Sequence, residues 1–228
     1  MSLFISFDPN TSISILSKEL NWVIMMIFLM TSMYYFWSKP NRLTICMNNS
    51  FYNISKQFEI ALKTCKDSSK LLFTALFLFI LNCNLIGLIP NVFTSTSHLF
   101  LNLFISIPMW MGFFFYGWIT YTNKMFAHLV PKGTPTPLIS FMVLIELISN
   151  LIRPLTLSIR LMANMVSGHL LLTLMGNSMV GSSIFMVILL TSLQSILSLL
   201  ELGVAMIQAY VFCTLLTLYS DDSDMMSN

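Results

Sequence analysis

The sequence carries very little charge. Only 9% of its 228 residues are Asp, Glu, Lys or Arg, whereas 56% are apolar and the mean hydropathy is +0.81. A soluble domain carries roughly 25% charged residues. So few charges cannot cover a water-facing surface, and we therefore expect the bilayer to be the solvent of this chain. The net charge of +2 is too small to indicate nucleic-acid binding.

Cysteine is scarce and scattered. Cys46, Cys65, Cys83 and Cys213 form no CxxC pair, and the last two lie in apolar runs. Because metal sites need tighter clusters, we expect reduced structural thiols and no metal. There is no phosphate-cradling Gly-rich loop either, so we expect no nucleotide chemistry and no cofactor. The N-terminus shows no pattern of a cleaved signal or an Arg-rich presequence.

Apolar runs predict an all-α integral membrane protein with a single membrane domain. A span of ~20 residues crosses a ~30 Å hydrocarbon core. We expect a first transmembrane helix at 20–37, an amphipathic surface helix at 44–70, a helical hairpin at 71–121, and long helices at 138–174 and 184–219. Each long segment is either two spans or one strongly tilted helix, and the lack of a turn cluster inside the last favours tilt.

Basic residues predict the orientation in the membrane. Six of them lie between the first and second spans, and Lys124 and Lys132 follow the third span. Loops rich in Lys and Arg stay on the inner side of the membrane. We therefore expect the N-terminus and the loop at 91–98 outside, and the C-terminus inside.

Five ionisable residues fall within the two long segments. They are Glu146, Arg153, Arg160, His169 and Glu201. A charge near the bilayer centre costs ~2.5–3.5 kcal/mol on insertion scales, so such residues line polar cavities or pair with partners. The default interpretation is a transport path.

Helical spacing orders these groups. At 100° per residue, one stripe of the first long helix carries Glu146, Arg153, Arg160 and Asn164, whereas His169 points to another side. On the second long helix Glu201 and Gln208 share a face. We expect two polar routes, each reaching partway through the membrane: an outer one from His169 and Glu201, and an inner one from Glu146 and Asp222, with Arg160 between them.

Plainer interpretations stand beside this one. A lone membrane histidine is often a helix–helix hydrogen-bonding residue, a Glu and an Arg can form a buried structural pair, and Asp222 alone reads as a solvated tail residue. His98 and His128 lie in or near loops, so we assign them no chemistry. Arg160 is harder to explain in this way, because its guanidinium keeps its proton.

Two motifs on the long segments resemble a known family. They are Leu157-Ser-Ile-Arg160-Leu-Met-Ala-Asn164 followed by Gly168-His169, and Leu200-Glu201-Leu-Gly-Val-Ala-Met-Ile-Gln208-Ala-Tyr-Val-Phe. Both resemble the signatures of subunit a of F-type ATP synthases. The loop at 126–135 and the opening Phe7-Asp8-Pro9 look like arthropod mitochondrial versions. The resemblance covers essentially the whole chain.

The resemblance implies a role for each candidate residue. Arg160 matches the family's essential arginine, which faces a carboxylate of the c-ring. His169 and Glu201 match residues of one half-channel of the family. Glu146 and Asp222 match residues of the matrix half-channel, and Asn164 and Gln208 match polar neighbours of the arginine. Vertebrate members carry Gln at the position of Arg153, whose role stays open.

The resemblance also implies the setting. The expected place is the mitochondrial inner membrane, with the N-terminus in the intermembrane space and the C-terminus in the matrix. Expected partners are the c-ring, the peripheral stalk, other membrane-sector subunits, lipid and protons. The chain itself would contribute no ATP chemistry.

Two competing functions are weighed against this one. A proton-coupled secondary transporter usually shows paired, interrupted helices in two related halves, and no such repeat is seen. A structural respiratory-complex subunit with a buried ion pair is the other. The substitution Arg160→Lys distinguishes this structural role from a proton gate, because a structural pair tolerates the change better than a gate that needs a permanent, planar charge.

Overall fold

The computed structural model describes residues 7–8, 21–22, 41–62, 67–89, 92–120, 122, 124–125, 129–130 and 136–225. Throughout these residues the regular structure is helical, which confirms the all-α class. The elements are α2 (Arg42–Ala61), α3 (Asp67–Gly87), η2 (Ser95–Ser97), α4 (Leu99–Thr120), η3 (Thr136–Leu138), α6 (Ile139–Met179) and α7 (Ile184–Met225). The first transmembrane helix expected at 20–37 lies outside the described residues except for positions 21–22.

Within the part of the chain that the structure describes, four helices are long and apolar enough to cross a membrane, and the chain is therefore a multi-pass membrane protein. They comprise Ser69–Gly87, Leu99–Thr120, Ile139–Met179 and Ile184–Asp221. None of the most apolar stretch of the last helix is buried within the chain. Its leucine and isoleucine side chains thus face lipid or another subunit instead of a core of their own.

The core forms where four helices meet. Phe58 of α2, Phe73 of α3, Leu161 of α6 and Phe212 of α7 belong to one buried apolar cluster. Helix α7 packs against α3, α4 and α6, so it runs through the centre of the bundle. The apolar faces that these helices turn toward one another are what holds the bundle together.

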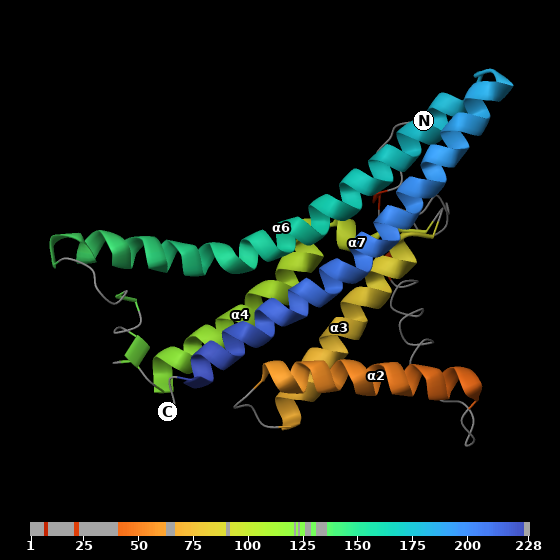
Figure 1. Ribbon diagram of the computed structural model, residues 1–228. Helices are drawn as coiled ribbons and strands as arrows, with labels where there is room; N and C mark the ends of the chain where they lie inside the picture. The colour runs from red at the N-terminus through yellow and green to blue at the C-terminus, as the bar shows by residue number, and fades with distance from the viewer. Residues whose placement is uncertain are drawn as a thin grey trace, which may run out of the picture.

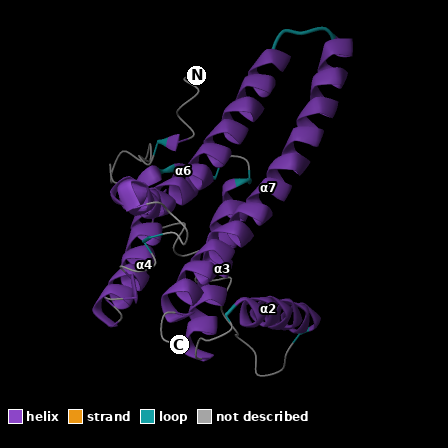
Figure 2. Cartoon of the chain, turned by 60° about the vertical axis from the view of Figure 1, so that its left-hand side comes forward, coloured by secondary structure: helices purple, strands orange, loops and turns teal. Residues whose placement is uncertain are grey.

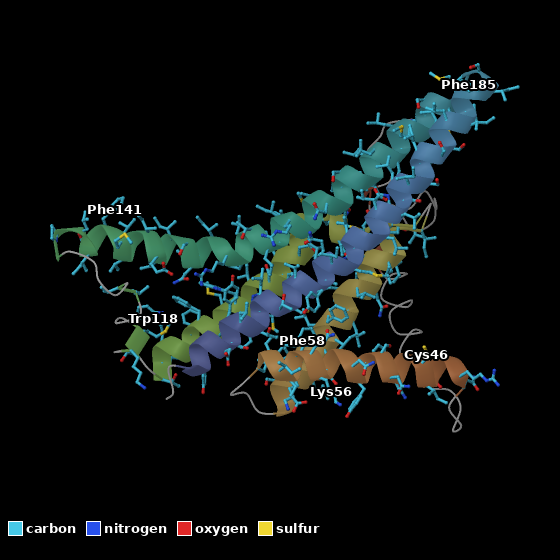
Figure 3. All side chains as sticks on the ribbon, in the orientation of Figure 1. Cys46, Lys56, Phe58, Trp118, Phe141 and Phe185 are labelled. Atoms are coloured by element: carbon cyan, nitrogen blue, oxygen red, sulfur yellow. The ribbon has the colours of Figure 1, made fainter. Side chains whose placement is uncertain are left out.

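Helix α2 lies across one end of α3 (Figure 1). Phe58 points into the bundle and is only 1% exposed, whereas Lys56 points away from it (Figure 3). The Lys56 Nζ lies 4.7 Å from the centre of the Tyr52 ring. One apolar face and one basic face are typical of a helix that lies along a membrane surface.

The turn between α3 and α4 is polar but buried. Thr94, Ser95 and Thr96 are each only 2% exposed. The Asn102 side chain donates a hydrogen bond from Nδ2 to the Thr96 carbonyl at 2.8 Å. Because lipid offers no hydrogen bonds, irregular backbone at this depth needs such internal partners.

Helices α6 and α7 extend side by side beyond the rest of the bundle (Figures 1 and 2). Their shared tip carries Phe185, which is 75% exposed (Figure 3). Gly181 makes the tight turn between them with φ +85°, a conformation that glycine adopts without steric cost. At 1.5 Å per residue, 41 residues of α6 span about 62 Å, twice the hydrocarbon thickness. This contour length is about twice what an upright span needs.

Helix α6 also changes direction along its length (Figure 1). Pro154 is its internal proline. A proline removes one backbone hydrogen bond and pushes away the preceding turn, which is a common cause of a helix bend. The bend separates the part of α6 that carries Glu146 from the part that carries His169.

Candidate functional site

A cavity of about 160 Å³ lies between α6 and α7, beside the end of α3. Its polar walls are Asn164, Ser167 and His169 from α6 and Glu201 from α7, and the rest is largely apolar, including Leu88. A water molecule takes about 30 Å³ in the liquid, so the space is large enough for several. The cavity is at the end of the bundle where α3 turns toward α4.

Glu201 and His169 face this cavity with buried polar atoms that lack partners. Among the described residues, neither carboxylate oxygen of Glu201 nor the Nε2 atom of His169 makes a hydrogen bond. Buried polar atoms are nearly always paired, and exceptions call for an explanation such as a chemical role or a bound water. Water entering the cavity would supply those partners and link the two side chains.

Gly168 is the reason that Glu201 fits. A Cβ atom at position 168 would overlap the Glu201 Oε1 atom. Glycine thus leaves the space in which α7 lays its carboxylate directly against α6. Gly168 belongs to the first of the two sequence motifs, and in the structure it shapes the site.

His169 is held by elements far from it in the sequence. Its imidazole interacts with the backbone of Gly87, the last residue of α3. The Phe7 ring meets it edge to face, with ring centres 6.3 Å apart and planes at 88°. Sequence reasoning predicted neither contact.

Asn84 is a second residue that the sequence analysis missed. It is 1% exposed, and its Nδ2 donates to the Ala205 carbonyl at 3.3 Å, whereas its Oδ1 has no partner within the described residues. Ala205 follows Glu201 by one helical turn, so Asn84 ties α3 to the part of α7 that carries the carboxylate. The asparagines Asn82 and Asn84 in the otherwise apolar run of α3 were the signal that could have revealed it.

The two arginines of α6 differ in their surroundings. Arg153 lies 3.6 Å from Glu146, measured from Nη2 to Oε1, and its guanidinium lies 5.4 Å from the centre of the Tyr219 ring. Arg160 is exposed and forms no ion pair or hydrogen bond with any residue that the structure describes. Its permanent charge therefore stands on the outer surface of the chain.

The remaining candidates lie apart from the cavity. Glu146 precedes His169 by 23 residues, about 35 Å along the helix. Gln208 is half-buried on α7 and does not line the cavity. Asp222 belongs to the last turns of α7, and its side chain lies outside the described part of the structure.

The histidines of the loops are placed only in part. The His98 ring lies 5.4 Å from the Trp22 ring and 5.2 Å from the Phe93 ring, measured between centres. His128 lies outside the described residues. These ring contacts pack His98 into the α3–α4 turn, where its Nε2 atom is buried without a hydrogen-bond partner among the described residues.

Comparisons with known proteins agree on one family. The family described as "ATP synthase A chain" matches residues 19–221. The "ATP synthase subunit a" of Locusta migratoria is 48% identical over 222 residues, which cover 97% of this chain and 98% of the relative. The proteins of that name from Anopheles quadrimaculatus and Drosophila melanogaster are 48% and 46% identical, with the same coverage.

Proposed function

This chain belongs to the family of ATP synthase A chains, and we propose that it conducts protons through the membrane sector of a mitochondrial ATP synthase. Two aqueous half-channels and a gating arginine would couple proton flow to rotation of a c-ring and so to ATP synthesis. The alignment with insect proteins, at 48% identity over 97% of the chain, supports the subunit assignment. The four membrane-length helices fit a subunit of the membrane sector.

The main support for a gating role of Arg160 is that its charge has no partner among the described residues. Around it, Thr156, Ala163 and Ser167 are exposed on successive turns of α6. Small side chains let a second helix approach closely within a membrane. An exposed cation with small neighbours is thus suited to meet a carboxylate on a passing helix of the c-ring.

The cavity supports an outer half-channel. It holds Asn164, His169 and Glu201 and lies beside the α3–α4 turn, which the positive-inside rule assigns to the intermembrane space. Unpartnered polar atoms of His169 and Glu201 can accept or pass a proton through water. The cavity ends near Asn164, one helical turn from Arg160, so a proton arriving there could reach a ring carboxylate beside the arginine.

The opposite end of the two long helices supports a matrix half-channel. Glu146 lies there with its partner Arg153, and Tyr219 of α7 packs on that arginine. Asp222 follows Tyr219 by three residues, and Gln208 lies along α7 between this end and Glu201. Because Arg153 is already paired with Glu146, it leaves Arg160 as the charge available to a ring carboxylate.

The mechanism follows from charge and solvation. A ring carboxylate that receives a proton from the outer half-channel becomes neutral and can face lipid, because burial disfavours the ionised form. After nearly a full turn it would release that proton into the matrix half-channel. Arg160 favours the ionised carboxylate as it passes and repels a proton that would leak straight across. The membrane potential supplies ~2.3 kcal/mol per charge per 100 mV.

The same proposal gives the placement of the chain. Its N-terminus would lie in the intermembrane space and its C-terminus in the matrix, with the peripheral stalk and other membrane-sector subunits as further partners. The exposed apolar side of α7, with Phe185, Leu199 and Ile207, offers the surface for lipid and for these neighbours.

The test is ATP-driven proton pumping in inner-membrane vesicles that carry Arg160→Ala, with ATP hydrolysis followed in parallel. We expect pumping to vanish while the complex still assembles. Arg160→Lys should also pump poorly, since a lysine lacks the planar, delocalised charge. Ser178→Ala is the control, because it changes an exposed side chain of the same helix 18 residues away from Arg160. Pumping near the unmodified level in Arg160→Ala would refute the gate.

A further inference from the structure

The N-terminal part of the chain reaches the candidate proton path. Phe7 precedes His169 by 162 residues, yet their rings meet edge to face with centres 6.3 Å apart. Aromatic pairs prefer this perpendicular geometry at centre distances of 4.5–7 Å. Phe7 is half-buried, so its ring is packed against the protein. The contact is thus a specific one between two rings.

A second contact places the N-terminal part on the same side of the molecule. The Trp22 ring lies 5.1 Å from the Phe93 ring and 5.4 Å from the His98 ring, measured between centres. Both partners belong to the turn between α3 and α4, next to Leu88, which lines the cavity. Phe7 and Trp22 therefore both lie at the outer end of the bundle.

His169 needs a defined ring orientation to handle a proton. Its two nitrogens are distinct, and what one of them contacts decides what the other can do. The imidazole interacts with the backbone of Gly87 on one side, while Nε2 is buried without a partner among the described residues. A side chain that fixes the plane of the ring fixes where Nε2 points.

We propose that Phe7 is a positioning residue for His169, which holds the imidazole plane so that Nε2 faces the cavity shared with Glu201. The edge of one ring against the face of the other restricts rotation of the imidazole about its χ2 torsion. The inference rests on the proposed function, since it assigns Phe7 to the outer half-channel. It gives the N-terminal segment a part in proton entry.

The test measures passive proton flow through the membrane sector after the catalytic head has been stripped from vesicles. Phe7→Leu keeps an apolar side chain but removes the ring, and should slow proton flow about two- to tenfold, given the usual strength of such ring pairs. Phe7→Tyr keeps the ring and should restore flow to within about twofold of the unmodified protein. Phe141→Leu is the control, because it removes an exposed aromatic of α6 that precedes His169 by 28 residues, about 42 Å along the helix.

A double variant separates positioning from general packing. In a His169→Ala background, Phe7→Leu should cause no further loss, because the ring that it orients is gone. Equal flow in Phe7→Leu and the unmodified protein, equal slowing by Leu and Tyr, or a further loss in the His169→Ala background would each overturn the proposal. If Phe7→Leu prevents assembly, Phe7→Met takes its place with the same expectations.

The proposed function fails in a different way. His169→Ala alone should slow proton flow strongly. If it does not, the outer half-channel is wrongly assigned, whatever Phe7 does. If His169→Ala slows flow and Phe7→Leu does not, the half-channel stands and only the role of Phe7 is refuted.

Discussion

Gly168→Ala should impair proton pumping without loosening helix α6. In the structure, a Cβ atom at this position would lie 2.7 Å from Glu201 Cδ and 3.0 Å from Glu201 Cγ. Ordinary carbon contacts are ~3.5–4.0 Å, so the Cγ atom must move by roughly half an ångström or more. Moving Cγ displaces the whole Glu201 side chain and with it the carboxylate.

The size of the effect follows from that displacement. Forcing a side chain off its rotamer costs ~0.5–1.5 kcal/mol. If Glu201 must return to its present position for each proton, the same free energy lowers the rate about two- to tenfold. Helix propensity acts the other way, since alanine is favoured over glycine by ~0.8–1.0 kcal/mol within a helix. We therefore expect normal assembly and reduced pumping in the same variant.

The assay is ATP-driven proton pumping per ATP hydrolysed, in vesicles with equal amounts of assembled complex. Gly176→Ala is the matched control, because it makes the same change on the same helix where a Cβ atom would meet nothing within 4 Å. It should pump like the unmodified protein. Equal pumping by the Gly168 and Gly176 variants would show that the position of Glu201 does not limit proton flow.

Three further predictions concern other parts of the path. Arg153→Gln removes an ion pair whose side chains are 40% and 36% exposed, so the stability of the complex, measured by thermal inactivation, should fall by about 1 kcal/mol or less. Proton pumping should persist. Its loss would contradict the separate roles given to the two arginines. Asn84→Leu should cost ~0.5–1.5 kcal/mol of stability for one hydrogen bond to Ala205, measured by thermal inactivation of the solubilised complex, whereas Asn84→Asp should cost more because it buries an uncompensated charge; equal losses would refute this account. Single cysteines at Val92 and Lys124, both exposed, should react with an impermeant thiol reagent from opposite sides of the membrane, and labelling from one side would overturn the topology.

Local pattern was enough to predict the helical class and the shared stripe of Glu146 and Arg153. These two residues are seven apart, and the structure pairs them, although the sequence analysis left the role of Arg153 open and grouped Glu146 with Asp222. The same rule separates Asn164 from His169 by about 140° around the axis. Both nevertheless line the cavity, because neighbouring helices surround α6 at this level. A helical wheel gives angles around one helix but not the shape of the space beside it.

The rest could not be predicted because it depends on contacts between distant segments. Asn84 bonds a carbonyl 121 residues away, and Phe7 packs on a ring 162 residues away. The periodicity of a helix does not show which other helix it contacts, or at which residues. The sequence indicates a polar loop at 91–98, and within it Ser95 is only 2% exposed. Two of its hydroxyl groups have partners within the turn, since Thr94 Oγ1 donates to Ser97 Oγ and Ser97 Oγ donates to the Thr94 carbonyl, whereas Thr96 Oγ1 has no partner among the described residues.

Arg160 is a charged residue of the long helices that lacks a partner in the described part of the chain. Glu146 and Arg153 neutralise each other, and Glu201 shares a cavity with His169. Arg160 remains on an exposed surface without a partner in the part of the chain that the structure describes. An unpaired arginine inside a membrane costs ~2.5–3.5 kcal/mol on insertion scales and cannot escape that cost by losing its proton. A carboxylate carried past it on another subunit would offset this cost at each encounter, so the charge that makes the isolated chain unfavourable in lipid is the same charge that would attract the rotor.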